Sequence, residues 1–248
     1  IRRSLYDGMI ANNEYMAQFF QDSSHFGGIG IPSQVIYHWS DPALQLVKEA
    51  PEISDSKALQ FGYMGSVMSL FHTGNFMNFE TLKDEFDIVF HDTEVGRDVT
   101  KEIKKGEKYD TKTDRLRMLT NGASPLPESI KFNVHINIRE IGSDVSKFKP
   151  CSKLATAAAF GHNIISTIDE SIKDLLPRDY PFLLNSTDID DVRAMFHKVE
   201  EDFNSSKKLW KRGLRMMQDV KKRLEFSHVI DEYEDMLKRI VTNSVLSG

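Results

Sequence analysis

Cationic and hydroxyl side chains gather in residues 139–153, just before an alanine-rich stretch, and this combination suits the binding of phosphate. Arg139 ends an apolar run, and Ser152 and Lys153 come directly before the sequence LATAAAF. That sequence contains no Gly or Pro, so it predicts a helix over Leu154–Phe160. A helix N-terminus offers free backbone N–H groups and the positive end of the helix dipole. We therefore expect Arg139, Ser152 and Lys153 to hold an anion where this helix begins.

The same residues also have a purely structural interpretation. Helix N-termini commonly collect such side chains, so Ser152 could be an N-cap, and Arg139 and Lys153 could be solvated charges. Cys151, in the same segment, is either a reactive thiol or a small buried side chain. It is the single cysteine of the chain, which excludes an intrachain disulfide.

Strands and helices alternate around this segment. Val134, Ile136 and Ile138 are separated by polar residues, as in a strand, and Gly161 ends the predicted helix. Asn163–Thr167 then predicts a buried strand. Such alternation is typical of an α/β fold with a mostly parallel sheet.

Further elements follow the same pattern in both directions. The predicted strands are Asp7–Ala11, Gln34–Trp39, Ala58–Tyr63, Asp87–His91, Arg115–Thr120 and Pro181–Leu184. The predicted helices are Asn13–Phe20, Ala43–Lys48, Phe79–Phe86, Ile189–Phe203, Lys207–Phe226 and Ser227–Val241. The segment at 50–56 is polar and contains a proline, so we place a domain boundary there.

The sequence KPCSKLATAAAFGHNII resembles the K-P-x-[ST]-K-L-x-x-A-x-A-x-G-x-P-x-I signature in the C-terminal domain of GT-B-fold glycosyltransferases. Asn163 stands where the family usually has Pro. The resemblance implies an α/β fold of GT-B type, with two Rossmann-like domains and a reduced N-terminal domain. It assigns residues 1–57 to the acceptor side and 58–226 to the donor-binding domain. Residues 227–248 would form a C-terminal crossover helix that packs back on the first domain.

The resemblance also implies a role for each residue near the donor. Arg139, Ser152 and Lys153 would hold its diphosphate. The turn of Gly65 and Ser66 would contact the donor, and Glu170 would face the sugar or ribose. The short first domain is similar to that of small virus-encoded glycosyltransferases of the chlorovirus type, for which a UDP-pentose such as UDP-xylose is a candidate donor.

A glycosyltransferase also needs a base that takes the proton of the acceptor hydroxyl. Asp41 and His38 lie at the end of the predicted strand that finishes at Trp39, at the edge where α/β sheets bind ligands. Asp41 is our first choice, His38 the second and Asp7 the third. The structural alternatives are an N-cap for Asp41 and a packed strand residue for His38.

Charge and motifs exclude some partners. The formal net charge of −5 argues against a general nucleic-acid binder. Asp188 and Asp190 imitate a metal-binding Asp-x-Asp pair, but their place predicts a helix cap, so we expect no metal and no other cofactor. Neither a signal peptide nor a membrane-spanning run is visible, so we expect a soluble, cytoplasmic protein without stable membrane insertion.

An apolar stripe on the basic helix has two interpretations. The stripe consists of Met216, Met217, Val220 and Leu224. We favour packing of this stripe into the core. The alternative is that the helix, through its basic and apolar faces, binds an anionic membrane surface.

Together these observations predict a metal-independent, inverting glycosyltransferase that moves a sugar from a nucleotide-sugar, a UDP-sugar, to a hydroxyl of a glycan acceptor. A non-catalytic nucleotide- or glycan-binding module and a nucleotide-sugar epimerase are the alternatives. Hydrolysis or transfer of the donor separates an enzyme from a binding module.

Overall fold

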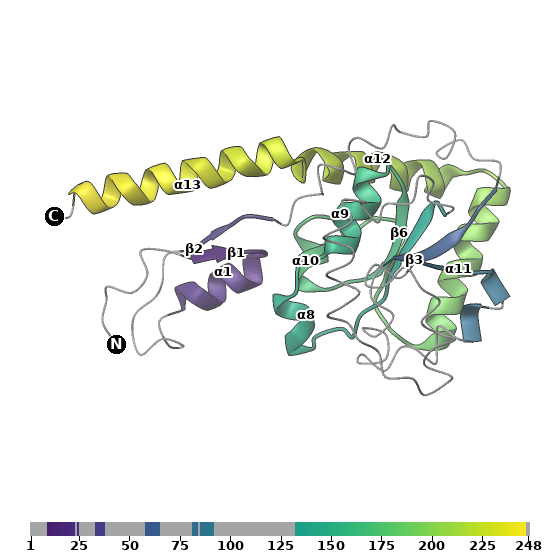
Figure 1. Cartoon of the computed structure of the whole chain (residues 1–248). Helices are drawn as coiled ribbons and strands as arrows, with labels where there is room; N and C mark the ends of the chain where they lie inside the picture. The colour runs from purple at the N-terminus through teal and green to yellow at the C-terminus, as the bar shows by residue number, and fades with distance from the viewer. Residues whose placement is uncertain are drawn as a thin grey trace, which may run out of the picture.

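The computed structural model describes residues 9–22, 24, 33–37, 58–64, 81–83, 85–91 and 132–246 (Figure 1). Its strands are β1 (Met9–Ala11), β2 (Ser33–Val35), β3 (Phe61–Met64), β4 (Val89–His91), β5 (Val134–Asn137), β6 (Asn163–Thr167) and β7 (Leu183–Leu184). Its labelled helices are α1 (Glu14–Gln21), α8 (Asp144–Phe148), α9 (Ser152–Ala159), α10 (Glu170–Lys173), α11 (Ile189–Asn204), α12 (Lys208–Arg223) and α13 (Phe226–Leu246).

The described strands form two separate parallel sheets. β1 pairs with β2, and the larger sheet has the order β4-β3-β5-β6-β7. In chain order this larger sheet reads 2-1-3-4-5, a doubly wound arrangement. The chain moves from β3 to one side to form β4 and then to the other side to form β5. The point between β3 and β5 is therefore the topological switch point, where such sheets bind ligands beyond their carboxyl ends.

Helices cover both faces of the larger sheet. Phe61 pairs in register with Val134, so both side chains point to the face where Phe196 of α11 packs, with its ring 4.5 Å from that of Phe61. His135 and Asn137 alternate with Val134 and point to the opposite face. The α9 segment lies on that face, because Asn137 contacts Cys151, the residue before the helix. The small side chains of α9 allow this close approach.

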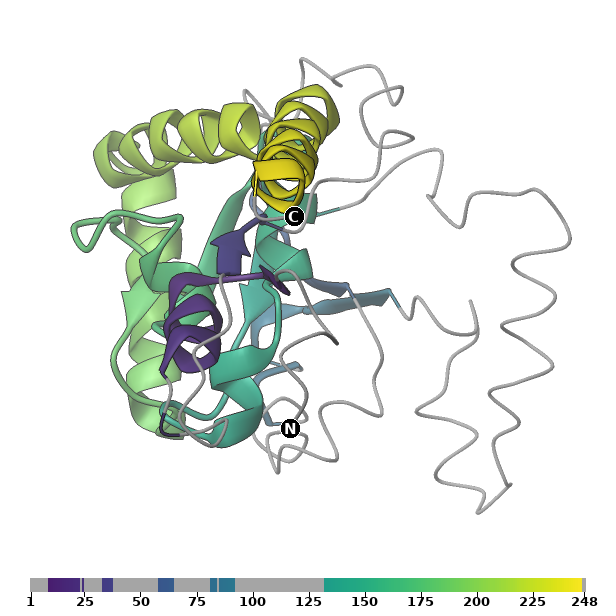
Figure 2. The same cartoon turned by 90° about the vertical axis from the view of Figure 1, so that its left-hand side faces the viewer.

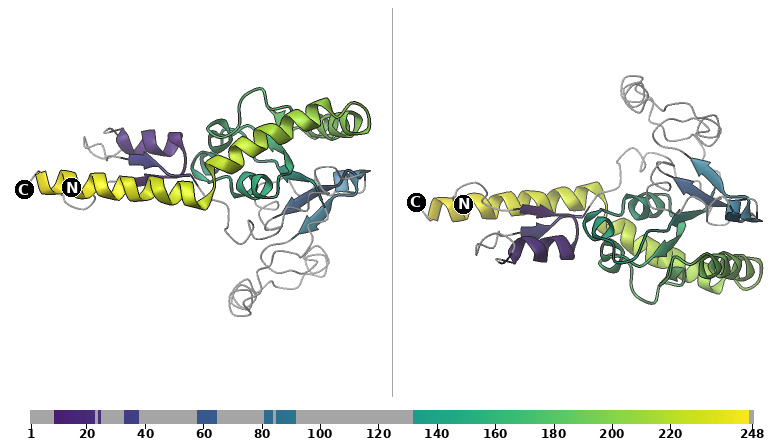
Figure 3. Two further views of the ribbon diagram at one scale, coloured as in Figure 1. Left: turned by 90° about the horizontal axis from the view of Figure 1, so that it is seen from above. Right: turned by 90° about the horizontal axis from the view of Figure 1, so that it is seen from below.

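The last helix connects the two sheets of the protein. We call residues 9–37 the first unit and residues 58–224 the second unit. Helix α13 leaves the second unit and runs along the β1–β2 pair (Figures 1 and 3). Its Val229 and Met236 form a small buried cluster with Ile36, which follows β2. Helix α13 is thus the predicted C-terminal crossover helix, and compared with the predicted range Ser227–Val241 it begins one residue earlier and ends five residues later.

Other boundaries differ from the sequence-based prediction in instructive ways. We expected an irregular loop before the alanine-rich helix, but residues 144–148 form α8, which Ser143 caps by accepting from the N–H of Ser146. Helix α9 begins at Ser152 rather than at Leu154. The predicted strands at Gln34–Trp39 and Pro181–Leu184 are shorter in the structure, as β2 and β7.

Several predicted elements cannot be compared with the structure. The helix Ala43–Lys48, the strand Arg115–Thr120 and the domain boundary at 50–56 lie outside the described residues. The helix predicted at Asn13–Phe20 is present as α1, and Asn13 is its N-cap, since its side-chain oxygen accepts from the N–H of Met16.

Candidate functional site

Lys153 lies at the switch point of the larger sheet. It belongs to the first turn of α9, which follows β5, and its ammonium nitrogen lies 4.9 Å from the centre of the Tyr63 ring on β3. Tyr63 is the next-to-last residue of its strand and is 2% exposed. The ammonium group of Lys153, on the helix that follows β5, thus lies against the end of β3. A doubly wound sheet binds its ligand between these two strands.

The N-terminus of α9 has no side-chain cap. The N-cap residue is Cys151, and its side chain accepts no capping hydrogen bond. The helices α1, α8, α10 and α11 differ, because an Asn, Ser or Asp side chain caps each of them. Ser152 is the first helical residue and is exposed, so its interpretation as the N-cap was wrong. The first backbone N–H groups of α9 therefore keep their capacity to bind an anion.

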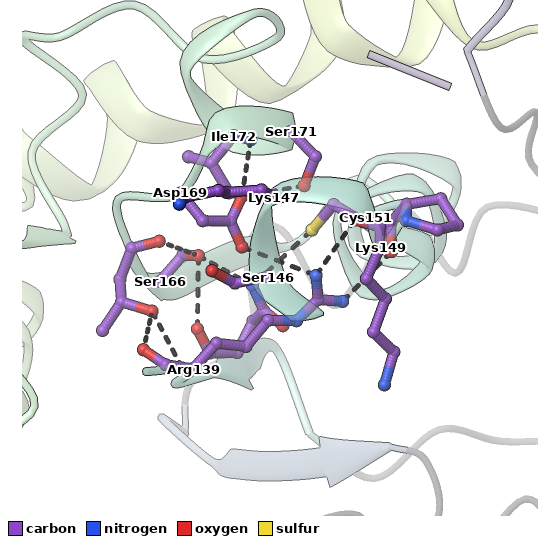
Figure 4. A network of polar contacts seen from close by, with 12 residues as sticks. Arg139, Ser146, Lys147, Lys149, Cys151, Ser166, Asp169, Ser171 and Ile172 are labelled. Carbon is purple, nitrogen blue, oxygen red and sulfur yellow. Dashed lines mark hydrogen bonds and ion pairs between the residues drawn. The ribbon is translucent and has the colours of Figure 1, made fainter. Parts of the chain in front are cut away.

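Arg139 sits behind this helix start and is largely buried (Figure 4). Its Nη1 donates to the carbonyl oxygen of Lys149 at 3.4 Å, and its Nη2 donates to that of Pro150 at 3.1 Å. Nη1 also lies 3.5 Å from Oδ2 of Asp169. Its backbone is held as well, since its N–H donates to Oγ1 of Thr167. The guanidinium thus fixes the segment that leads into α9, and its charge remains close to Lys153.

Burial and this charge act together on Lys153. Loss of hydration, with the nearby positive charge of Arg139 as the second cause, lowers the pKa of Lys153 to about 8. Lys149 also has a lowered pKa, through burial first and Arg139 second, although its side chain points away from the guanidinium (Figure 4). A phosphate dianion would replace the lost hydration of Lys153 with a charge-assisted hydrogen bond.

Cys151 is not a reactive thiol in this environment. It is 4% exposed, and burial raises the pKa of its thiol, with Arg139 opposing the shift. A thiol with a raised pKa is a poor nucleophile. The structure thus supports the alternative that Cys151 is a small buried side chain.

The two acidic residues at the start of α10, Asp169 and Glu170, have different partners. Asp169 caps the helix by accepting from the N–H of Ile172 and the hydroxyl of Ser171, and it also pairs with Arg139. Glu170, the residue that we expected near the donor, makes an ion pair with Lys173 at 2.7 Å. It follows β6 at the carboxyl edge of the sheet, and its contact with the donor stays a prediction. The sequence analysis missed the pairing of Asp169 with Arg139.

The departure from the family signature at Asn163 has a structural explanation. Its side chain is fully buried, donates to the carbonyl oxygen of Trp210 at 3.1 Å and accepts from the hydroxyl of Tyr180 at 3.2 Å. A Cβ atom at Gly213 would come within 2.3 Å of the Asn163 side-chain oxygen, so glycine is required where α12 passes the strand. Asn163 thus joins β6 to α12 by hydrogen bonds that Pro could not make.

The structure describes only part of the predicted site, whose roles stay predictions. It brings Arg139, Ser152 and Lys153 together at one edge of the sheet. The remaining predicted residues lie outside the described ranges: Asp7, His38, Asp41, Gly65 and Ser66. Within the ranges that are described, no group of three or more His, Cys, Asp or Glu residues could hold a metal ion. Asp188 caps α11 through the N–H of Asp190, as predicted for the Asp-x-Asp imitation.

The apolar stripe of α12 packs into the core. Met217, Val220 and Leu224 are each at most 1% exposed, which favours the interpretation as core over attraction to a membrane. No helix in the described part of the chain combines the length and the apolarity that a membrane span requires.

Solved structures share this architecture. Anabaena HepE, whose crystal structure is in complex with UDP and glucose, is similar over 94% of this chain and 63% of its own, with a TM-score of 0.60 and 11% identity. A glycosyltransferase from Rickettsia africae is similar over 95% of this chain and 64% of its own, with a TM-score of 0.51 and 11% identity. The chain has the GT-B fold. It spans less than two thirds of the length of either neighbour.

No protein-family model matches the chain, and no curated protein sequence matches it significantly. At 11% identity the structural similarity establishes the fold and leaves the chemistry to the site itself.

Proposed function

We propose that this protein is a metal-independent glycosyltransferase that binds a nucleotide-diphosphate sugar at the N-terminus of α9. The observation that carries the proposal is the position of Lys153: a cation in the first turn of a helix without a side-chain cap, at the switch point of a GT-B sheet. The donor diphosphate would accept hydrogen bonds from the first backbone N–H groups of α9, from Ser152 and from Lys153.

The transfer step follows from these contacts. The bond between the anomeric carbon of the sugar and the β-phosphate oxygen breaks, and the acceptor hydroxyl oxygen bonds to that carbon with inversion. Negative charge then grows on the leaving nucleoside diphosphate. Lys153 and the dipole of α9 would stabilise that charge, with Arg139 adding positive potential from behind the helix start. This arrangement supplies the charge that a metal ion provides in other transferases, and we expect transfer to persist in excess EDTA.

The proton of the acceptor hydroxyl needs a base, for which we propose Asp41, with His38 and then Asp7 as the replacements. Asn caps a helix about as well as Asp but cannot accept the proton. Asp41→Asn should therefore fold and bind donor normally, with turnover lowered roughly 10²–10⁴-fold. If Asp41→Asn retains full turnover, the base is His38 or Asp7.

The identity of the donor is best found by a thermal-shift screen of UDP-, GDP-, ADP- and TDP-sugars. A ligand that binds only the native state raises the melting temperature. We expect the UDP-sugars, UDP-xylose and UDP-glucose among them, to give the largest shift. HepE, the neighbour crystallised with UDP and glucose, supports starting with uridine. Absence of a shift with every nucleotide-sugar would contradict the proposal.

Turnover assays with a bound donor distinguish the enzyme from two other functions. Transfer to a glycan, or slow hydrolysis, supports a glycosyltransferase. Tight nucleotide binding without turnover indicates a binding module, and release of free nucleotide-sugar isomers without an acceptor indicates an epimerase.

A further inference from the structure

The end of α8 is held by the first unit. The last carbonyl groups of a helix have no N–H partner within the helix, so they accept hydrogen bonds from donors outside it. The carbonyl oxygen of Lys147 accepts from Nδ2 of Asn13 at 2.8 Å, and that of Phe148 accepts from Nδ2 of Asn12 at 3.0 Å. Two side-chain amides of the first unit thus satisfy two carbonyl groups of the second unit.

The next two carbonyl groups are held from the other side. Those of Lys149 and Pro150 accept from the guanidinium of Arg139. Four successive carbonyl groups, those of residues 147–150, are therefore hydrogen-bonded to three side chains on two different units. The chain then passes through Cys151 to the start of α9 at Ser152. We call residues 147–153 the phosphate loop.

Asn13 and its neighbours in the first unit are themselves held in place. Asn13 is fully buried, and its Oδ1 caps α1 by accepting from the N–H of Met16 at 2.7 Å. Asp174 of the second unit accepts from the N–H of Glu14 at 2.9 Å. The ring of Phe148 packs edge-on against two aromatic rings of α1. Figure 2 shows α1 in front of the helices of the second unit to which these contacts attach it.

We propose that Asn12 and Asn13 are positioning residues that couple the docking of the first unit to the shape of the phosphate loop. While the first unit is docked, the amides fix the end of α8, and the start of α9 is then fixed only three to five residues further on. Coupling of this kind is reciprocal, so binding of a diphosphate at α9 strengthens the docking of the first unit. That the ligand at α9 is a diphosphate rests on the function proposed above.

A purely structural role makes a different prediction. If the two amides only satisfy buried carbonyl groups, their loss lowers stability and leaves the affinity of the folded protein for a diphosphate unchanged. If they position the phosphate loop, the affinity falls as well, and the loop exchanges its amide hydrogens faster.

Two variants and one control separate these possibilities. Asn13→Ser keeps an oxygen that caps α1 but removes the amide donor to Lys147, and Asn12→Ala removes the donor to Phe148. Val199→Ala is the matched control, because Val199 is fully buried in α11 and its truncation lowers stability without contact with the phosphate loop. Each protein is measured by hydrogen exchange of residues 147–153 without ligand, and by titration with inorganic pyrophosphate and with UDP.

We expect faster exchange at residues 149–153 and affinity for pyrophosphate and UDP lowered about 3–10-fold in each asparagine variant, with neither change in Val199→Ala. Unchanged exchange in the asparagine variants overturns the positioning role, and so does unchanged affinity when the wild-type protein binds. If the wild-type protein binds neither pyrophosphate nor UDP, the proposed function fails, while the exchange experiment still decides whether the asparagines hold the loop.

Discussion

The two ends of α9 lie in opposite chemical environments. At the N-terminus, the helix has no side-chain cap, Ser152 is exposed and burial lowers the pKa of Lys153. Among the described residues, no Asp or Glu raises this pKa again. At the C-terminus, polar groups are paired inside the protein. Gly161 adopts a left-handed backbone with φ of 69°, and its N–H and that of His162 donate to carbonyl groups of the last turn.

A pair of histidines completes the closed end. Nε2 of His135 and Nδ1 of His162 lie 3.1 Å apart, and both rings are at most 3% exposed. They are surrounded by the rings of Phe132 and Phe160. Polar residues at the two ends of one helix thus have different roles. Groups satisfied inside the protein maintain the fold, whereas groups left with unused hydrogen-bonding capacity at the edge of the sheet are available to a ligand.

The largest effect is expected when the closed end is broken. His162→Ala removes a buried ring and leaves Nε2 of His135 without its partner. Cavity formation and the unpaired polar group should together lower the free energy of unfolding by about 3 kcal/mol, measured by urea denaturation. Affinity for a nucleoside diphosphate should stay within twofold of wild type. Weakened binding at unchanged stability would show that the histidines belong to the ligand site.

The second prediction separates the two cations at the open end. Lys153→Ala should weaken binding of the nucleoside diphosphate and of the intact donor about 10–150-fold, as calorimetric titration would measure, because a charge-assisted hydrogen bond contributes about 1.5–3 kcal/mol. Arg139→Ala should weaken this binding as well, because it removes positive potential and the donor that holds the carbonyl groups of Lys149 and Pro150. Only Arg139→Ala should also lower the free energy of unfolding, by about 1–3 kcal/mol, since it removes the cation beside Oδ2 of Asp169 and the donor to two carbonyl groups. Unchanged affinity in both variants would remove the phosphate site.

The third effect is the response of the closed end to acid. Burial lowers the pKa of His162 to about 4, and burial together with His162 and Lys153 lowers the pKa of His135 well below its ordinary value. The unfolded chain binds protons near pH 6.5, whereas the folded protein does not. The contribution of these histidines to the free energy of unfolding is thus fully present above pH 6.5. It falls as the pH drops toward 4, by up to about 1.4 kcal/mol per pH unit for one histidine. His162→Phe should have a flatter acid limb in urea denaturation between pH 7 and 4. Equal acid limbs in the variant and the wild type would assign the loss to carboxylates.

Local patterns predicted much of the fold. The alternation of Val134, Ile136 and Ile138 and the run from Asn163 to Thr167 located two neighbouring strands. The pattern did not report burial, because helices cover both faces of the sheet and His135 and Asn137 are buried as well. Helix α8 was missed because DVSKF is short and ends before a proline, so its stability depends on contacts with the first unit rather than on propensity.

The site was predictable as a set of residues but not as a network. Arg139, Ser152 and Lys153 stand close together in sequence near a predicted helix start. Asn12 and Asn13 contact the same loop from more than 130 residues away, and no local pattern announces such a contact. Likewise, the pairing of Asp169 with Arg139 depends on β5 and β6 lying side by side.

The pH dependence of UDP binding tests the central claim most directly. With a pKa of about 8, Lys153 is charged at pH 7 and loses its charge as the pH rises. Phosphate groups are already ionised there, so the charge of the diphosphate stays constant. We predict that the affinity of the wild-type protein is highest near pH 7 and falls above pH 8 by up to about tenfold per unit, while Lys153→Arg, which stays charged, gives a flat profile from pH 7 to 9. Coinciding profiles of the two proteins would contradict the account, and so would wild-type affinity in Lys153→Ala at pH 7.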